Sequence, residues 1–95
     1  MLFKNKKKEV VREFLSYVEK ELLPIQGQTE ITEKIKDLIH QSYELIDYNE
    51  YVLAFEMVAD ELIDNYILLD QKGISLAESI TEMFELDKKT LSDLG

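Results

Sequence analysis

Apolar residues recur every three or four positions along most of this 95-residue chain, and this spacing constrains the fold more than any other feature. It is the spacing that places side chains on one face of an α-helix. The apolar–polar alternation typical of a β-strand does not occur in the sequence. With one Pro and three Gly, the chain has few turn signals and its elements should be long. These observations predict an all-α protein.

Four segments carry the helical pattern. The first should end before Pro24, because the residue preceding a proline avoids helical angles. The second should begin after Thr29, which is typical of a helix cap. Asp47 with Glu50 resembles a capping box for the third, and Asn49 is a competing cap. The predicted helices cover residues 6–23, 30–46, 48–65 and 70–86.

The start of the fourth helix has two candidates. Ser75 with Glu78 resembles a capping box, whereas Asp70 would cap an earlier turn that tolerates Gly73. Residues 87–94 are expected to add one loose final turn. Because the connections are short and there is no internal repeat, we expect a single domain. The simplest arrangement is a four-helix, mostly antiparallel bundle with a short C-terminal turn.

Negative charge is concentrated in the middle of the chain. Between Asp37 and Gln71 there are nine carboxylates and no Lys or Arg. Residues 1–20 hold six Lys/Arg and three acids, so the rest of the chain is more acidic than the net charge of −9 indicates. An acidic body repels nucleic acid and anionic lipid and attracts basic proteins. The charge pattern therefore predicts a protein that binds a basic protein partner.

Signatures of catalysis and of metal binding are missing. The sequence has no Cys, one His, and no phosphate-binding loop, serine-hydrolase elbow or zinc-protease motif. Asp37 and His40 form one carboxylate-x-x-His pair, but a helical di-metal site uses two. Glu56, Asp60 and Asp64 lack the turn glycine and alternating acids of a calcium loop. We therefore expect no enzymatic activity, no metal and no cofactor.

The sequence also bears on the compartment. No run approaches the roughly 18 apolar residues of a membrane span. Arg12 and Glu13 interrupt the apolar stretch that a secretion signal would need. With no Cys to require an oxidising compartment, we expect a cytoplasmic protein that is monomeric when free and binds neither membrane nor nucleic acid directly.

The third predicted helix is the strongest candidate for a docking surface. Most of its apolar residues share one face, but Leu53 and Met57 project into the acidic face. Side chains at i and i+4 touch, so these two should form a small apolar ridge flanked by carboxylates. Apolar anchors carry most of the energy of binding, and the surrounding charges set rate and orientation. Two alternatives remain: the acidic face is only solvated, or the pair packs under another segment such as the N-terminus.

Four tyrosines lie close in sequence to these acids. Tyrosine is common in interfaces because it buries a large area and keeps a hydroxyl for hydrogen bonding. For Tyr51 and Tyr66 we favour packing at the core boundary, whereas Tyr43 and Tyr48 are evenly balanced between packing and partner contact. The candidate partner-binding residues are Asp37, Tyr43, Glu44, Tyr48, Glu50, Leu53, Glu56, Met57, Asp60, Glu61 and Asp64.

Residues 45–63 resemble the central helix of the Maf-type immunity family of bacterial polymorphic and contact-dependent toxin systems. In that family a small residue precedes an apolar–Glu pair, and an acid follows one turn later. The corresponding residues here are Ala54, Phe55, Glu56 and Asp60. The resemblance also includes the linker 66–70 and the following helix, so that it covers about half of the chain in total. The first predicted helix does not resemble this family.

The resemblance implies a stoichiometric inhibitor that binds a cognate toxin domain and blocks its active site or its substrate path. Many such toxins are nucleases, which are basic where they hold phosphate, so the resemblance and the charge pattern favour the same partner. Two alternatives stay open. One is an acidic regulatory adaptor or nucleic-acid mimic that blocks a DNA- or RNA-binding protein. The other is a self-associating structural bundle with Leu53 and Met57 at its seam.

Overall fold

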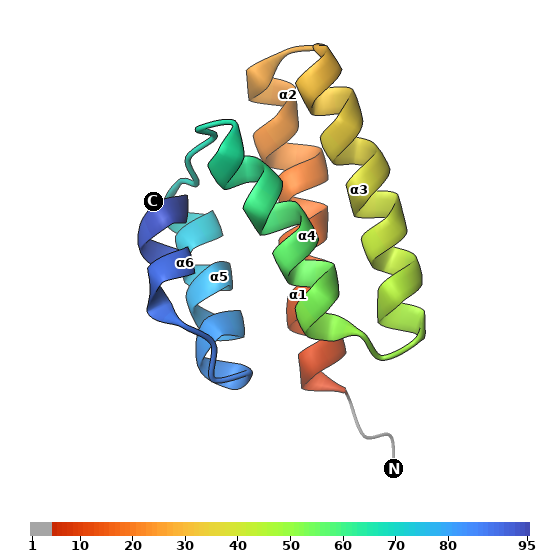
Figure 1. The fold of residues 1–95 in the computed structure, drawn as a ribbon, viewed down its shortest axis with the longest axis vertical. Coiled ribbons are helices and arrows are strands. Elements are labelled where there is room, and N and C mark those ends of the chain that lie inside the picture. Colours follow the sequence, from red (N-terminus) through yellow and green to blue (C-terminus); the bar gives the residue numbers. More distant parts are fainter. Residues whose placement is uncertain (1–4) are drawn as a thin grey trace.

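The computed structural model describes residues 5–95, and every regular element in that range is helical. Helices that are joined by a turn run in opposite directions, as an antiparallel bundle requires (Figure 1). No helix among the described residues is long and apolar enough to cross a membrane. The all-α prediction is confirmed. The elements in chain order are α1 (Lys6–Tyr17), η1 (Val18–Leu22), α2 (Leu23–Gln26), α3 (Glu30–Asp47), α4 (Tyr51–Asp64), α5 (Gln71–Met83) and α6 (Lys88–Leu94).

The first helix does not stop before Pro24, so the predicted end at residue 23 is wrong. It continues from α1 through the π-helical turn η1 into α2. In the π turn the Leu23 N–H donates to the carbonyl of Val18, five residues back. A proline within an α-helix lacks one donor and its ring collides with the preceding turn, and the wider π turn provides the room. The helix ends instead at Gly27, whose φ of 83° breaks the helical path.

The connection between α3 and α4 also differs from prediction. The helix cap at Thr29 is present, with the Thr32 N–H donating to its hydroxyl at 3.1 Å. The predicted capping box of Asp47 and Glu50 is wrong, because Glu50 is the N-cap of α4 and its side chain makes no capping hydrogen bond. The chain turns by placing Asn49 at a φ of 63°. Helix α4 therefore begins three residues later than predicted.

Asp70 is the cap of α5, which settles the choice between the two predicted starts. Its carboxylate accepts a hydrogen bond from the Gly73 N–H at 3.0 Å. Gly73 allows α5 to approach α1 closely, since a Cβ at that position would lie 2.6 Å from the Tyr17 ring. The predicted loose final turn is a fifth helix, α6, capped by Asp87 and closed by the buried Leu94.

Helix α1 is the centre of the core, because it packs against α3, α4 and α5. In Figure 1 it lies behind α4. The rings of Phe14 on α1 and Phe55 on α4 meet edge to face with centroids 5.0 Å apart. Ile31 is an exception to the buried apolar face of α3, because it is 44% exposed. It lies in the first turn of α3, at the open end of the helical hairpin.

Candidate partner-binding surface

Helices α3 and α4 form an antiparallel pair whose alignment is marked by one ion pair. Lys34 Nζ in the first half of α3 lies 3.0 Å from Glu61 Oε1 near the end of α4. The opposite ends of the two helices therefore lie together, beside the turn formed by residues 48–50. Figure 1 shows this turn joining α3 and α4 at the lower end of the two helices.

A shallow depression lies between α3 and α4 near that turn. Its volume is about 260 Å³ and its lining is mainly apolar. Leu53 is 47% exposed and Tyr48 is 79% exposed, whereas Met57 is half-buried. We call this feature the α3–α4 depression, and it is lined by Gln41, Glu44, Leu45, Tyr48, Leu53 and Met57.

The expectation that Leu53 stays outside the core is confirmed, but the pair does not form a protruding ridge. Leu53 and Met57 form one wall of the depression, because Leu45 and Tyr48 on the α3 side rise beside them. The described start of α1 contacts other residues: the Asn5 amide donates to the Tyr51 hydroxyl at 2.9 Å. Among residues 5–95, no segment packs over the depression closely enough to bury Leu53.

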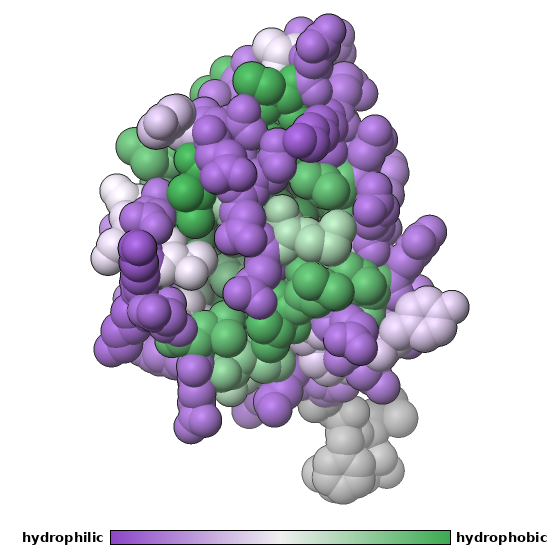
Figure 2. All heavy atoms as spheres, viewed as in Figure 1, coloured by the Kyte–Doolittle hydropathy of each residue, from purple (hydrophilic) through white to green (hydrophobic). Residues whose placement is uncertain are grey.

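Carboxylates surround this apolar surface. Figure 2 shows hydrophilic residues in a band over the exposed side of α4, with hydrophobic residues on either side. On α4 the exposed acids are Glu56, Asp60 and Asp64, spaced four residues apart, and we call them the acidic row. Within the described residues, neither Glu44, nor Glu50, nor any member of the acidic row lies within 4 Å of a cationic nitrogen. The negative charge of this surface is thus not neutralised by the described part of the chain.

Glu61 differs from the other predicted acids. Besides its ion pair with Lys34, its carboxylate accepts a hydrogen bond from the Asn65 amide at 3.1 Å. Glu61 is therefore already paired within the chain, and its assignment as a partner-binding residue stays a prediction. Its position toward α3 gives it a cation from that helix.

Asp37 lies on the same side of α3 as the depression. Positions 37, 41, 44 and 48 are separated by steps of four, three and four, which align them along one stripe of a helix. Asp37 is exposed and lies one turn from Gln41 in the lining. The structure thus places Glu44 and Tyr48 in the lining of the depression and Asp37 outside it, one turn farther along α3.

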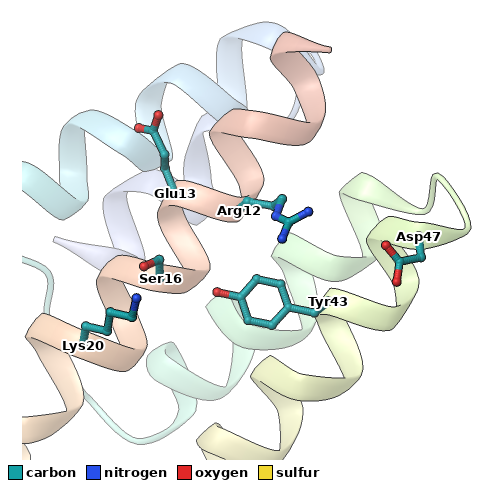
Figure 3. A pocket seen from close by; sticks show the side chains of 6 residues that line it. All are labelled: Arg12, Glu13, Ser16, Lys20, Tyr43 and Asp47. Atoms are coloured by element: carbon teal, nitrogen blue, oxygen red, sulfur yellow. The ribbon is translucent and has the colours of Figure 1, made fainter. Parts of the chain in front are cut away.

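Tyr43 lies on a different face, turned toward α1. Figure 3 shows its ring between α3 and α1, close to Arg12 and Ser16. The Arg12 guanidinium is 5.9 Å from the ring centroid, within cation–π range. Burial and the nearby negative charge of Glu19 raise the pKa of the Tyr43 hydroxyl. Tyr43 therefore packs toward α1 and does not line the depression, and its assignment as a partner-binding residue stays a prediction.

The cleft beside Tyr43 is larger, at about 450 Å³, but its chemistry does not suit a small molecule. Ligand pockets are lined mostly by apolar side chains, whereas this cleft is lined by charged and polar groups of both signs. Among the residues that the structure describes, no group of three or more His, Asp or Glu is placed to hold a metal ion.

Sequence reasoning missed some exposed residues and placed others correctly. Tyr51 packs at the core boundary as predicted, 6.3 Å from the Phe84 ring. The same prediction for Tyr66 is wrong, because Tyr66 is 90% exposed. Leu45 is partly buried against the core and also lines the depression. Ile67 and Leu69 are buried whereas Leu68 is exposed, and the uniformly apolar sequence of these three residues gives no signal of this difference.

No protein-family model matches the chain, and neither the curated proteins nor the solved structures compared with it include a significant match. The class of the protein is therefore described from its fold and from this surface. It is an all-helical domain that carries an apolar depression surrounded by carboxylates.

Proposed function

We propose that this chain is a cytoplasmic, stoichiometric inhibitor of the immunity type, which binds a basic toxin domain through the α3–α4 surface. The observation that carries the proposal is the α3–α4 depression, where partly exposed apolar side chains lie among acids without cationic neighbours in residues 5–95. The sequence resemblance to the Maf-type immunity family favours the same class of partner.

The depression supplies the apolar part of the contact. At about 260 Å³ it is smaller than the roughly 300–1,000 Å³ of small-molecule pockets. It is suited to one apolar side chain of a protein partner. This side chain would pack against Leu53 and Met57 and bury them. Binding energy in protein interfaces is concentrated in such anchors.

The acids supply steering and orientation. A nuclease presents Lys and Arg where it holds phosphate, so an acidic surface is complementary to its substrate groove. The row of Glu56, Asp60 and Asp64 would speed association with such a groove and suppress wrong partners. The same acids disfavour stacking two copies of this face on each other, which argues against the self-associating alternative.

Co-expression with the product of the neighbouring reading frame tests the proposal. If that product is a toxin, this chain should restore growth and co-purify with it as an equimolar complex. Leu53→Ser should lose rescue and co-purification, while Ile25→Ser should keep both. Ile25 is a matched control because it is 77% exposed and lies in α2, at the end of the molecule away from the α3–α4 turn (Figure 1).

Two results would contradict the proposal. One is full rescue by the Leu53→Ser variant at equal expression level. The other is a neighbouring product that neither inhibits growth nor binds this chain. Binding without any effect on growth would favour the alternative of an acidic regulatory adaptor, which shares the surface but not the toxin.

A further inference from the structure

The linker between α4 and α5 displays two large side chains to solvent. Tyr66 is 90% exposed and Leu68 is 60% exposed. The residues between and after them, Ile67 and Leu69, are each only 7% exposed. The linker therefore has one side in the core and the other side in water.

Hydrogen bonds fix the backbone of this linker. The Ile67 N–H donates to the carbonyl of Leu62, and the Leu69 N–H donates to the carbonyl of Leu94, both at 2.9 Å. Asp70, at its end, caps α5. Because the linker backbone is already ordered, the linker would lose little conformational entropy when a partner contacts Tyr66 and Leu68.

The backbone at Tyr66 is in a conformation that glycine would adopt more readily. Its φ is 56°, in the left-handed region, which costs most residues about 1–2 kcal/mol. The chain needs this conformation to end α4, and glycine is the usual residue there. The same conformation follows α3 at Asn49 and α5 at Glu85, so it serves to end helices in this chain, and at Tyr66 it also turns the ring into solvent.

The linker and the depression lie at opposite ends of α4. Leu53 is in its first turn and Tyr66 follows its last residue, so the two are about 20 Å apart along the helix at 1.5 Å per residue. Between them runs the acidic row of Glu56, Asp60 and Asp64. Figure 1 shows α4 in front of the bundle, with the linker at its upper end and the α3–α4 turn at its lower end.

We infer that Tyr66 and Leu68 form a second apolar anchor of the same surface, and that its occupant is a basic, amphipathic protein segment lying along α4. This inference rests on the proposed function. Charge complementarity selects the occupant, because the acidic row between the anchors favours Lys and Arg. Size favours two anchors as well, since a stable interface buries about 800 Å² on each partner and the depression alone offers only a small part of that.

Binding of synthetic peptides tests this inference. We would use two labelled peptides made only of Lys and Leu in a helical pattern, one of about 18 and one of about 9 residues, which span roughly 27 and 13 Å as helices. Only the longer peptide reaches both anchors. Fluorescence anisotropy would compare the wild type, Leu53→Ser, the double variant Tyr66→Ser with Leu68→Ser, and the control Ile25→Ser. Circular dichroism would verify that each variant is folded.

The inference makes a different prediction for each peptide. For the longer one, the loss of either anchor should weaken binding about tenfold, because both anchors act at once. For the shorter one, the loss of either anchor should weaken binding by no more than about twofold, because the other anchor remains available. The Ile25→Ser variant should bind both peptides like the wild type.

Failure of this inference differs from failure of the proposed function. If the double variant binds the longer peptide like the wild type while Leu53→Ser loses affinity, the second anchor is refuted and the proposed function stands. If the wild type binds neither peptide, or if Leu53→Ser and the double variant both leave binding unchanged, the inference and the proposed function are both contradicted.

Discussion

The Tyr17 hydroxyl on α1 donates a hydrogen bond of 2.8 Å to Asp70 Oδ1 at the start of α5. The same oxygen accepts the Gly73 N–H. One carboxylate thus caps α5 and joins it to the central helix. Burial and the Asp70 carboxylate raise the pKa of Tyr17 to about 12, and the hydrogen bonds from Gly73 and Tyr17 lower the pKa of Asp70 below its usual 3.8.

This pair predicts how stability depends on alkaline pH. The pKa of Tyr17 is higher in the folded protein than in the unfolded chain, so its stabilisation is complete below pH 10 and is lost as the pH rises toward 12. Tyr17→Phe removes the hydrogen bond and should lower the free energy of unfolding by about 1 kcal/mol at neutral pH. Urea unfolding at several pH values should show this difference shrinking above pH 10. A difference that stays constant to pH 12 would show that the Tyr17 proton is not held by Asp70.

Ser42 on α3 is predicted to be a destabilising residue. Its hydroxyl is fully buried and has no hydrogen-bond partner in the structure. An unpaired buried hydroxyl costs about 1–3 kcal/mol, and alanine is the better helix former. Ser42→Ala should therefore raise the free energy of unfolding by about 1 kcal/mol. Thr81→Ala is the matched control and should lower stability, because the buried Thr81 hydroxyl donates to the Ala77 carbonyl at 2.8 Å. If Ser42→Ala and Thr81→Ala change the free energy of unfolding in urea equally, the Ser42 hydroxyl is not unpaired and destabilising.

Tyr66→Gly should increase the stability of the protein. Glycine relieves the left-handed strain, and the exposed ring leaves little packing to lose, so the free energy of unfolding should rise by up to about 1 kcal/mol. Tyr48→Gly is the control. Tyr48 is similarly exposed but has a φ of −99°, so glycine there should only lower stability. A Tyr66→Gly variant that unfolds at lower urea than the wild type would contradict the strain argument.

The sequence pattern predicted the helices better than their ends. The spacing of apolar residues reflects which side chains are buried, and it located all four long helical segments. The helix ends depend on which local backbone conformations and caps are adopted, and the spacing carries no information about these. A π turn accommodates Pro24, and the chain turns at Asn49 in a left-handed conformation, so that Glu50 and not Asp47 precedes α4. Helix α6 was expected only as a loose turn, because its short segment is stabilised by tertiary packing of Leu94.

Only part of the candidate surface could be predicted, because helical spacing describes one helix and not the packing between helices. Helical spacing within α4 alone placed Leu53 outside the core. That Tyr43 faces α1 depends on how α3 is rotated against α1, and the ion pair of Glu61 depends on how α3 aligns with α4. Neither can be derived from one helix at a time. The exposure of Tyr66 follows from the turn that ends α4, which has no sequence signal because the left-handed residue is not glycine.

The anchors should act mainly on the lifetime of the complex. Leu53→Ala and Met57→Ala should each raise the dissociation rate of the neighbouring-frame toxin severalfold and leave the association rate nearly unchanged, because apolar contacts form after encounter. The effect of Leu53→Ala should be the larger, since Leu53 is the more exposed of the two. Surface plasmon resonance with Ile25→Ala as control would measure both rates. A Leu53→Ala variant that dissociates like the control would remove the depression from the interface.

The most direct test of the acidic surface is the association rate constant measured by stopped flow at about 50 and about 500 mM sodium chloride. The toxin would be paired with the wild type, Asp60→Lys or Glu82→Lys. The last two change the net charge equally, but Glu82 lies on α5. We predict that the wild-type rate falls about tenfold or more with salt, that Asp60→Lys is slower and less sensitive to salt, and that Glu82→Lys stays close to the wild type. A wild-type rate that does not change with salt, or equal rates for the two variants, would contradict an acidic docking surface on α4.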